Sequence, residues 1–179
     1  DTTWEVALRD GAVFHDGTAV TADDVVFSFQ RVLDPANKSL YATFIPFLDS
    51  VAKKDDTTVT LALKYPFSLV AERLSVVKIV PKALVEKDQK AFDLAPVGTG
   101  PYKMIDNGAA SQKITFEAND AYTGPQPARA ATMEWQIIPD DSTRTNALTS
   151  DAVQAIDSVP VANLATLAQS KSVAAEQGF

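Results

Sequence analysis

The chain has 179 residues, enough for one large domain or two small ones with a real hydrophobic core. Hydrophobic residues make up 46%, but no apolar run approaches the roughly 18 residues that a transmembrane helix needs. The net charge of -7 argues against nucleic acid as a partner, because phosphate backbones are bound by clustered lysine and arginine. The absence of cysteine excludes disulfides, zinc-thiolate sites and thiol nucleophiles.

A strand over residues 4–9 and a helix over 22–33 are the first predicted elements. Large apolar residues stand at every second position in 4–9, as in a strand with one buried face. Over 22–33 they recur at spacings typical of a helix. Thr21 is expected to cap this helix with Asp24 at its amide-rich end, and Asp34-Pro35 to stop it.

Short elements are predicted in the middle of the chain. Alternation in residues 58–63 indicates a hairpin with a short strand around Val51. Residues 67–74 and 81–87 are expected to be helices, and the apolar run 76–80 a buried strand between them.

A second hairpin is predicted to follow the segment 97–102. It turns at Asn107-Gly108, because Asn-Gly is the strongest short hairpin signal. Residues 119–128 contain one glycine and two prolines, which indicates a loop and an internal boundary.

Two strands and two helices are expected after that loop, at residues 133–138 and 153–157 and at 140–148 and 161–168 respectively. Because strands and helices alternate irregularly, we predict a mixed α/β (α+β) fold and not a doubly wound sheet.

Several motifs together resemble the oligopeptide, dipeptide and nickel binding proteins of ABC importers. Their order and separation carry the resemblance, since each piece alone is weak. They are Leu8-Arg9-Asp10-Gly11, Phe14-His15-Asp16-Gly17-Thr18, Thr21-Ala22-Asp23-Asp24-Val25, Val97-Gly98-Thr99-Gly100-Pro101-Tyr102, Asn119-Asp120-Ala121-Tyr122, Arg144, Ala147-Leu148 and Ala155-Ile156-Asp157.

The resemblance implies a partial fold of the type II periplasmic-binding-protein kind. Such proteins are longer and close two lobes over a solute, so we expect a fragment that lacks a short N-terminal stretch and the second lobe. Residues 1–118 would form the peripheral subdomain of the first lobe, 119–129 a linker, and 130–179 part of the lobe's central sheet. No signal peptide is visible, and the strand-like start suggests a cut chain.

The residues that suggest chemistry have structural interpretations. His15 is the only histidine, so it supports neither a histidine metal cluster nor a catalytic triad, and we expect a surface turn residue. The pairs Asp23-Asp24 and Asp140-Asp141 precede predicted helices and are expected to cap them. No catalytic motif appears, and we expect no cofactor, no metal and no enzymatic activity.

Residues Gly98, Thr99, Gly100, Pro101 and Tyr102 are predicted to form a structural loop. A phosphate cradle is the alternative, but the lysine and hydroxyl residue of a P-loop are missing and a strand follows. We expect at least one of the two glycines at positive φ, where an added Cβ would be costly.

Aromatic side chains are the candidates for a solute cleft, because binding sites combine aromatic walls with a few polar groups. Tyr41, Tyr65, Phe67 and Tyr102 are such residues, with core packing as the alternative. The resemblance places Tyr41, Leu74 and Ser75 where the first lobe faces the cleft, so these three are the predicted ligand-binding residues.

The predicted function is capture of a small solute, with a peptide as the first candidate, outside the cytoplasm in the periplasm or at the cell surface, with or without a lipid anchor. The expected protein is a monomer that delivers its solute to the membrane permease of an ABC importer. The main alternative is a solute-sensing domain of a regulator with the same fold. A degenerate enzyme would need a catalytic cluster outside these residues. The sequence does not choose among peptides, nickel chelates, sugars and opine-like solutes.

Overall fold

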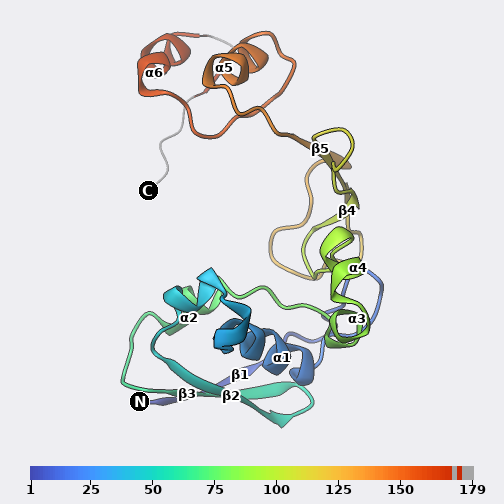
Figure 1. Cartoon of the computed structure of the whole chain (residues 1–179), viewed down its shortest axis with the longest axis vertical. Helices are drawn as coiled ribbons and strands as arrows, with labels where there is room; N and C mark the ends of the chain where they lie inside the picture. Colours follow the sequence, from blue (N-terminus) through green and yellow to red (C-terminus); the bar gives the residue numbers. More distant parts are fainter. Residues whose placement is uncertain (171–172, 175–179) are drawn as a thin grey trace. The chain divides into compact units, whose positions relative to one another are not determined.

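A computed structural model describes residues 1–170, 173 and 174, and divides the chain into two compact units, Asp1–Trp135 and Gln136–Phe179. The first unit contains strands and helices, the second contains two helices in its described part, and long connections join these elements (Figure 1). None of the helices in the described part is long and apolar enough to cross a membrane.

The first unit contains an antiparallel sheet of three strands in the order β1-β3-β2. Its strands are β1 (Thr3–Ala7), β2 (Leu48–Asp55) and β3 (Thr58–Leu63). The side chains of β3 alternate between buried and half-buried along the strand, so one face of the sheet belongs to the core. The strand over 4–9 and the hairpin are confirmed, with small shifts of the ends.

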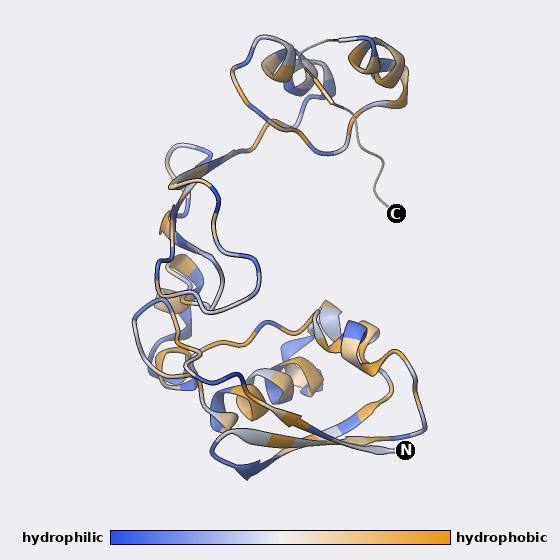
Figure 2. Ribbon diagram, turned by 180° about the vertical axis from the view of Figure 1, so that it is seen from behind, coloured by the Kyte–Doolittle hydropathy of each residue, from blue (hydrophilic) through white to orange (hydrophobic). Residues whose placement is uncertain are grey.

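Helix α1 (Ala22–Leu33) covers the buried face of this sheet, and apolar residues meet between the two layers (Figures 1 and 2). It begins with the predicted capping box: Thr21 Oγ1 accepts from the Asp24 amide, and the Asp24 carboxylate accepts from the Thr21 amide at 3.0 Å. The helix prediction is therefore confirmed. The core cluster comprises Ala22, Phe29, Ile45, Phe47, Leu48, Val51, Val59, Leu61, Leu63, Val70 and Val77.

Buried polar groups tie α1 to the segment that follows residue 79. Asp24, only 9% exposed, accepts a hydrogen bond from the Lys82 amide at 2.9 Å. Ser28 Oγ donates to Asp24 O and accepts from the Val80 amide at 3.0 Å. Five short helices follow α1 along the chain: η1 (Pro35–Asn37), η2 (Leu40–Phe44), α2 (Val70–Leu74), α3 (Lys82–Lys87) and α4 (Gln89–Leu94).

A second sheet has the order β4-β5-β6, with β4 (Tyr102–Asp106), β5 (Lys113–Ala118) and β6 (Thr132–Gln136). The predicted hairpin is confirmed, but its connection is six residues long, 107–112, and not a two-residue turn. Gly108 adopts φ +71° there, and the Asp106 side chain accepts a hydrogen bond from its amide. The connection therefore uses glycine where the backbone requires it.

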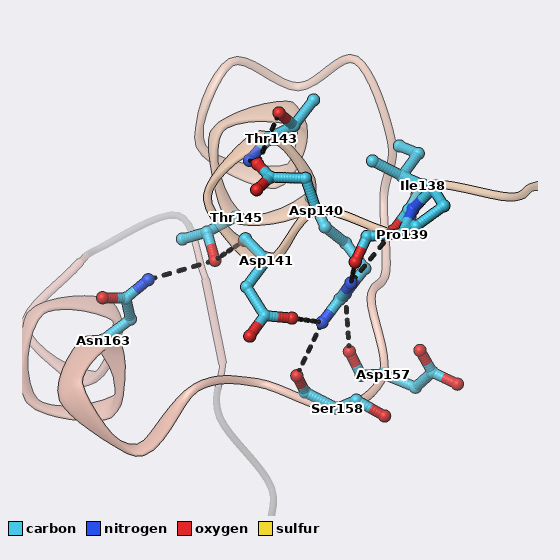
Figure 3. A network of polar contacts seen from close by, with 10 residues as sticks. Ile138, Pro139, Asp140, Asp141, Thr143, Thr145, Asp157, Ser158 and Asn163 are labelled. Carbon is cyan, nitrogen blue, oxygen red and sulfur yellow. Dashed lines mark hydrogen bonds and ion pairs between the residues drawn. The ribbon is translucent and has the colours of Figure 1, made fainter.

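The second unit contains α5 (Asp141–Thr149) and α6 (Val161–Ala168), near the predicted positions. Arg144 of α5 organises the backbone around it (Figure 3): its guanidinium donates to the carbonyl oxygens of residues 138, 139, 157 and 158 and to the Asp141 carboxylate. The guanidinium makes five hydrogen bonds in total. Arginine is the only side chain with five N–H donors in one planar group.

Two predicted strands are wrong. Residues 76–80 form a turn and an irregular segment, because the amides of Val76 and Val77 bond back to α2 carbonyls and the Val80 amide bonds to Ser28. Residues 153–157 also lack strand structure: the Val153 amide bonds to Ala147 O, and Asp157 O accepts from Arg144. In both segments apolar composition suggested a strand, while tertiary partners satisfy the backbone.

Candidate ligand-binding surface

Helix η2 presents its aromatic residues to solvent. In a 3₁₀-helix, residues three apart lie above one another. Ala42 and Ile45 form the inner row, and Ile45 is fully buried. Tyr41 and Phe44 form an outer row and are 51% and 46% exposed. The predicted ligand residue Tyr41 is therefore available at the surface, next to an aromatic residue that sequence analysis did not select.

The segment after β3 is held against the residues that follow η2. The Lys64 amide donates to Phe47 O at 2.9 Å, and the Phe47 and Phe67 rings stack with centroids 4.3 Å apart. Phe67 therefore packs against the core, which was the alternative to a place in the solute cleft. Tyr65 remains half exposed beside it.

The other two predicted ligand residues end helix α2. Leu74 is half-buried and packs against the core, whereas Ser75 is exposed and its hydroxyl donates to Glu72 O at 2.6 Å. A role in ligand binding stays a prediction for Tyr41, Leu74 and Ser75 alike.

An open groove of about 680 Å³ lies where β1 faces the segment 66–68. Aromatic and acidic side chains share its walls. They are Asp1, Thr3, Trp4, Glu5, Pro66, Phe67 and Ser68. The sequence pattern did not predict this groove, because alternation along the strand placed Trp4 on a buried face and gave no sign that residues 66–68 would lie opposite it.

The segment 97–102 is held by His15. The Gly98 amide donates to His15 Nδ1 at 3.2 Å, so the ring proton is on Nε2, which donates to Gly100 O at 3.0 Å. The His15 amide also donates to Gly98 O at 2.8 Å. His15 lies in a turn, as predicted, but it is half-buried and both of its ring nitrogens bond to backbone groups, so it is not simply a surface residue. Nothing near His15 in the sequence signals partners more than 80 residues away.

The prediction of a positive φ in this loop is wrong. Gly98 and Gly100 both lie outside the left-handed region, and a Cβ at Gly98 would come no nearer than 3.5 Å to the His15 ring. Hydrogen bonds from side chains, not glycine geometry, determine the loop. Because the Gly98 amide is used by His15, it does not face a free anion cradle.

Asn119 and Tyr102 complete this structural connection. The Asn119 side chain is nearly buried and donates to Gly100 O at 3.0 Å, so that carbonyl accepts from both His15 and Asn119. The Tyr102 hydroxyl accepts from the Ala130 amide at 3.1 Å. The arrangement supports the structural interpretation of the loop, whose role stays a prediction.

The paired carboxylates cap helices and form ion pairs. Asp24 belongs to the cap of α1, and Asp140 caps α5 by accepting from the Thr143 amide and hydroxyl, each at 2.7 Å. The bond from the Thr143 hydroxyl holds the pKa of Asp140 below its ordinary value. Lys53 bridges Asp23 and Asp56, and its hydrogen bond lowers the pKa of Asp23. Among the described residues, no three His, Cys, Asp or Glu side chains gather as metal ligands would.

Known proteins resemble the chain over nearly its whole length. The family model of bacterial extracellular solute-binding proteins, family 5, matches residues 1–178. The glutathione-binding protein GsiB of Escherichia coli O1:K1 is 29% identical over 173 residues, which are 96% of this chain and 34% of GsiB.

Two solved structures illustrate the likeness. The binding protein AgaA of A. tumefaciens R10, in complex with agropinic acid, is 32% identical with a TM-score of 0.85, over 95% of this chain and 35% of AgaA. The oligopeptide-binding protein AppA of Bacillus subtilis, in complex with a nonapeptide, is 29% identical with a TM-score of 0.76, over 92% of this chain and 34% of AppA.

The chain thus spans about a third of the length of these relatives. The expected fold class is confirmed, since the matching structures are type II periplasmic binding proteins and the match corresponds to part of one lobe. The predicted subdomain boundaries at residues 118 and 130 stay a prediction. The chain belongs to the bacterial extracellular solute-binding proteins of family 5.

Proposed function

We propose that the protein of which these residues form part binds a peptide or a similar small solute outside the cytoplasm and delivers it to the membrane permease of an ABC importer. The family match over residues 1–178 is the observation that carries this proposal. The relatives named above bind glutathione, agropinic acid and a nonapeptide, which supports a small solute without choosing one. Neither the family model nor these relatives favour the regulator alternative.

The proposed output is binding without catalysis. The single histidine has both ring nitrogens engaged with backbone groups, and the carboxylate pairs cap helices or form ion pairs. Tyr41 and Phe44 are the side chains on this lobe that we propose to contact the solute, because both rings are exposed on one face of η2. Leu74 and Ser75 are weaker candidates, since the first packs inward and the second bonds within its own turn.

Titration calorimetry with glutathione and short peptides tests the proposal. The full polypeptide encoded by the gene is expected to bind at least one of them, and Tyr41→Ala to weaken that binding, with Tyr122→Ala as an aromatic control outside η2. The 179-residue chain alone should bind at about 1 mM or more weakly, because one lobe supplies part of the contact area and no closure. Submicromolar binding by these residues alone would contradict the two-lobed mechanism, and no uptake defect in a gene deletion would contradict transport.

A further inference from the structure

A small pocket of the first unit lies where three segments that are distant in the sequence meet. Side chains and backbone from residues 9–13, 99–100 and 121–124 form it, and its volume is about 330 Å³. This volume is at the lower limit of small-molecule sites. No residue of η2 or of the groove beside β1 lines it, so it is a separate place on the first unit.

Hydrogen bonds within the first unit hold the three segments together. The Gly100 carbonyl accepts from His15 Nε2 and from Asn119 Nδ2, each at 3.0 Å. Arg9 Nη1 donates to Thr123 O at 3.3 Å, which links the segment after β1 to the loop after β5. The pocket is therefore formed by contacts among residues 9–124.

Three side chains bring hydrogen-bond donors to the pocket and leave most of them unused. The Arg9 guanidinium has five N–H groups, only one of which has an acceptor among the described residues. It also forms no ion pair within that part of the chain. The hydroxyl groups of Thr99 and Tyr122 have no hydrogen-bond partner among the same residues. One unpaired positive charge beside two hydroxyl donors favours an anion.

The Tyr122 ring owes its position to Gly124. A Cβ added at Gly124 would overlap the ring carbon Cζ and the hydroxyl oxygen, so glycine leaves room for the ring to lie against the backbone. The Tyr122 amide donates to Asn119 O at 3.1 Å. The place of the Tyr122 hydroxyl in the pocket wall therefore depends on the absence of a side chain at position 124.

We propose that this pocket binds the carboxylate of a small organic acid with a short apolar chain. A guanidinium fork matches the two oxygens of one carboxylate, and hydroxyl groups can donate to the remaining lone pairs. Ala12 and Val13, both half-buried, provide an apolar wall for the chain. A phosphate group fits less well, because Arg9 is the only cationic side chain among the described residues that line the pocket and the Gly98 amide is used by His15.

Titration calorimetry of the full polypeptide encoded by the gene tests this site with acetate, propionate and butyrate at constant ionic strength. At least one of the acids should bind with a Kd of about 1 mM. Propionamide, which has the shape of propionate without its charge, should bind at least about 10-fold more weakly than propionate. Binding of none of the acids up to about 20 mM would overturn the proposal. Equal binding of propionamide, or tighter binding of inorganic phosphate, would overturn the choice of a carboxylate.

Two arginine variants of the full polypeptide locate the binding. Arg9→Gln should weaken binding of the acid by about 10-fold or more, because a hydrogen-bonded charge is lost. Arg129→Gln removes the same charge from an exposed position that does not line the pocket and should leave binding unchanged. Equal losses in both variants, or no loss in Arg9→Gln, would contradict the proposal. Peptide binding should be the same with and without Arg9→Gln, and a parallel loss would refute a separate site.

Two further variants test the hydroxyl donor without a change of charge. Tyr122→Phe removes only the hydroxyl, and Gly124→Ala displaces the ring that carries it. Each should weaken binding of the acid by about threefold or more. Urea unfolding of each variant verifies that the first unit is still folded. Full affinity in both variants would exclude Tyr122 from the site and contradict the proposed arrangement.

Discussion

The two units of the chain are stabilised in different ways. In Asp1–Trp135 the face of a sheet and an amphipathic helix enclose a cluster of buried apolar side chains. In the second unit, Leu167 and Thr145 are the buried residues of the described part, and hydrogen bonds from Arg144 hold the loops. Apolar side chains of α6 stay exposed, with Val161 at 84%. Buried apolar contacts therefore dominate in the first unit, and polar contacts dominate in the second.

The largest expected effect is on the apolar core of the first unit. Leu61→Ala should lower the free energy of unfolding by about 2–5 kcal/mol, because the side chain is 1% exposed and leaves a cavity. Leu164→Ala on α6, where the side chain is 41% exposed, is the matched control and should cost less than about 1 kcal/mol. Urea unfolding measures both, and equal losses would contradict the contrast between the units.

Arg144→Lys is expected to destabilise the second unit alone, by about 2 kcal/mol. Lysine keeps the charge, but its ammonium cannot reach four carbonyls and a carboxylate in the planar arrangement that the guanidinium satisfies. Amide exchange should quicken over α5 and residues 157–163 and stay unchanged in β3. A uniform loss across both units would show that the network is not local.

Alanine substitutions at two glycines of the first unit distinguish backbone strain from hydrogen bonding as the basis of loop structure. Gly108→Ala should cost about 1–2 kcal/mol, because its φ is +71° and the new Cβ would lie 2.9 Å from the Lys113 carbonyl carbon. Gly98→Ala should be nearly neutral, since its φ is not positive and the space is open to 3.5 Å. Thermal unfolding compares the two, and the reverse order would reinstate glycine geometry as the basis of the 97–102 loop.

Removal of the α1 cap is expected to have a smaller effect. Thr21→Ala loses the hydroxyl that accepts from the Asp24 amide and should cost about 1 kcal/mol, with Thr21→Ser as the conservative control. Urea unfolding reports the change. An unaltered midpoint for the alanine variant would mean that the Asp24 carboxylate caps the helix without Thr21.

The smallest expected effect is a pH dependence at the α5 cap. The pKa of Asp140 is lowered in the folded chain by the Thr143 hydroxyl, so the stabilisation is present above the ordinary carboxyl value of 3.8 and is lost as the pH falls through the lower folded pKa. Unfolding midpoints between pH 5 and pH 3 should therefore fall less in Asp140→Asn than in the unmodified chain. An identical acid dependence would exclude this carboxyl as a contributor.

The exposed aromatic surface of η2 was only partly predictable. Tyr41 came from resemblance, whereas Phe44 could have been selected by the three-residue period had a 3₁₀-helix been expected there. The groove beside Trp4 could not, because it needs residues 66–68 to return to β1. Local patterns carry no information on which distant segment faces a strand edge.

The sequence by itself determined the elements whose causes are local: the capping box at Thr21, the alternation of β3 and the helix over 161–168 all follow from neighbouring residues. Tertiary structure alone decided the elements whose backbone partners are remote. Residues 76–80 have strand composition, but Ser28 takes the Val80 amide, and His15 holds a loop more than 80 residues away. A buried backbone group must find a partner, and where that partner is distant in the chain, the local pattern does not reveal it.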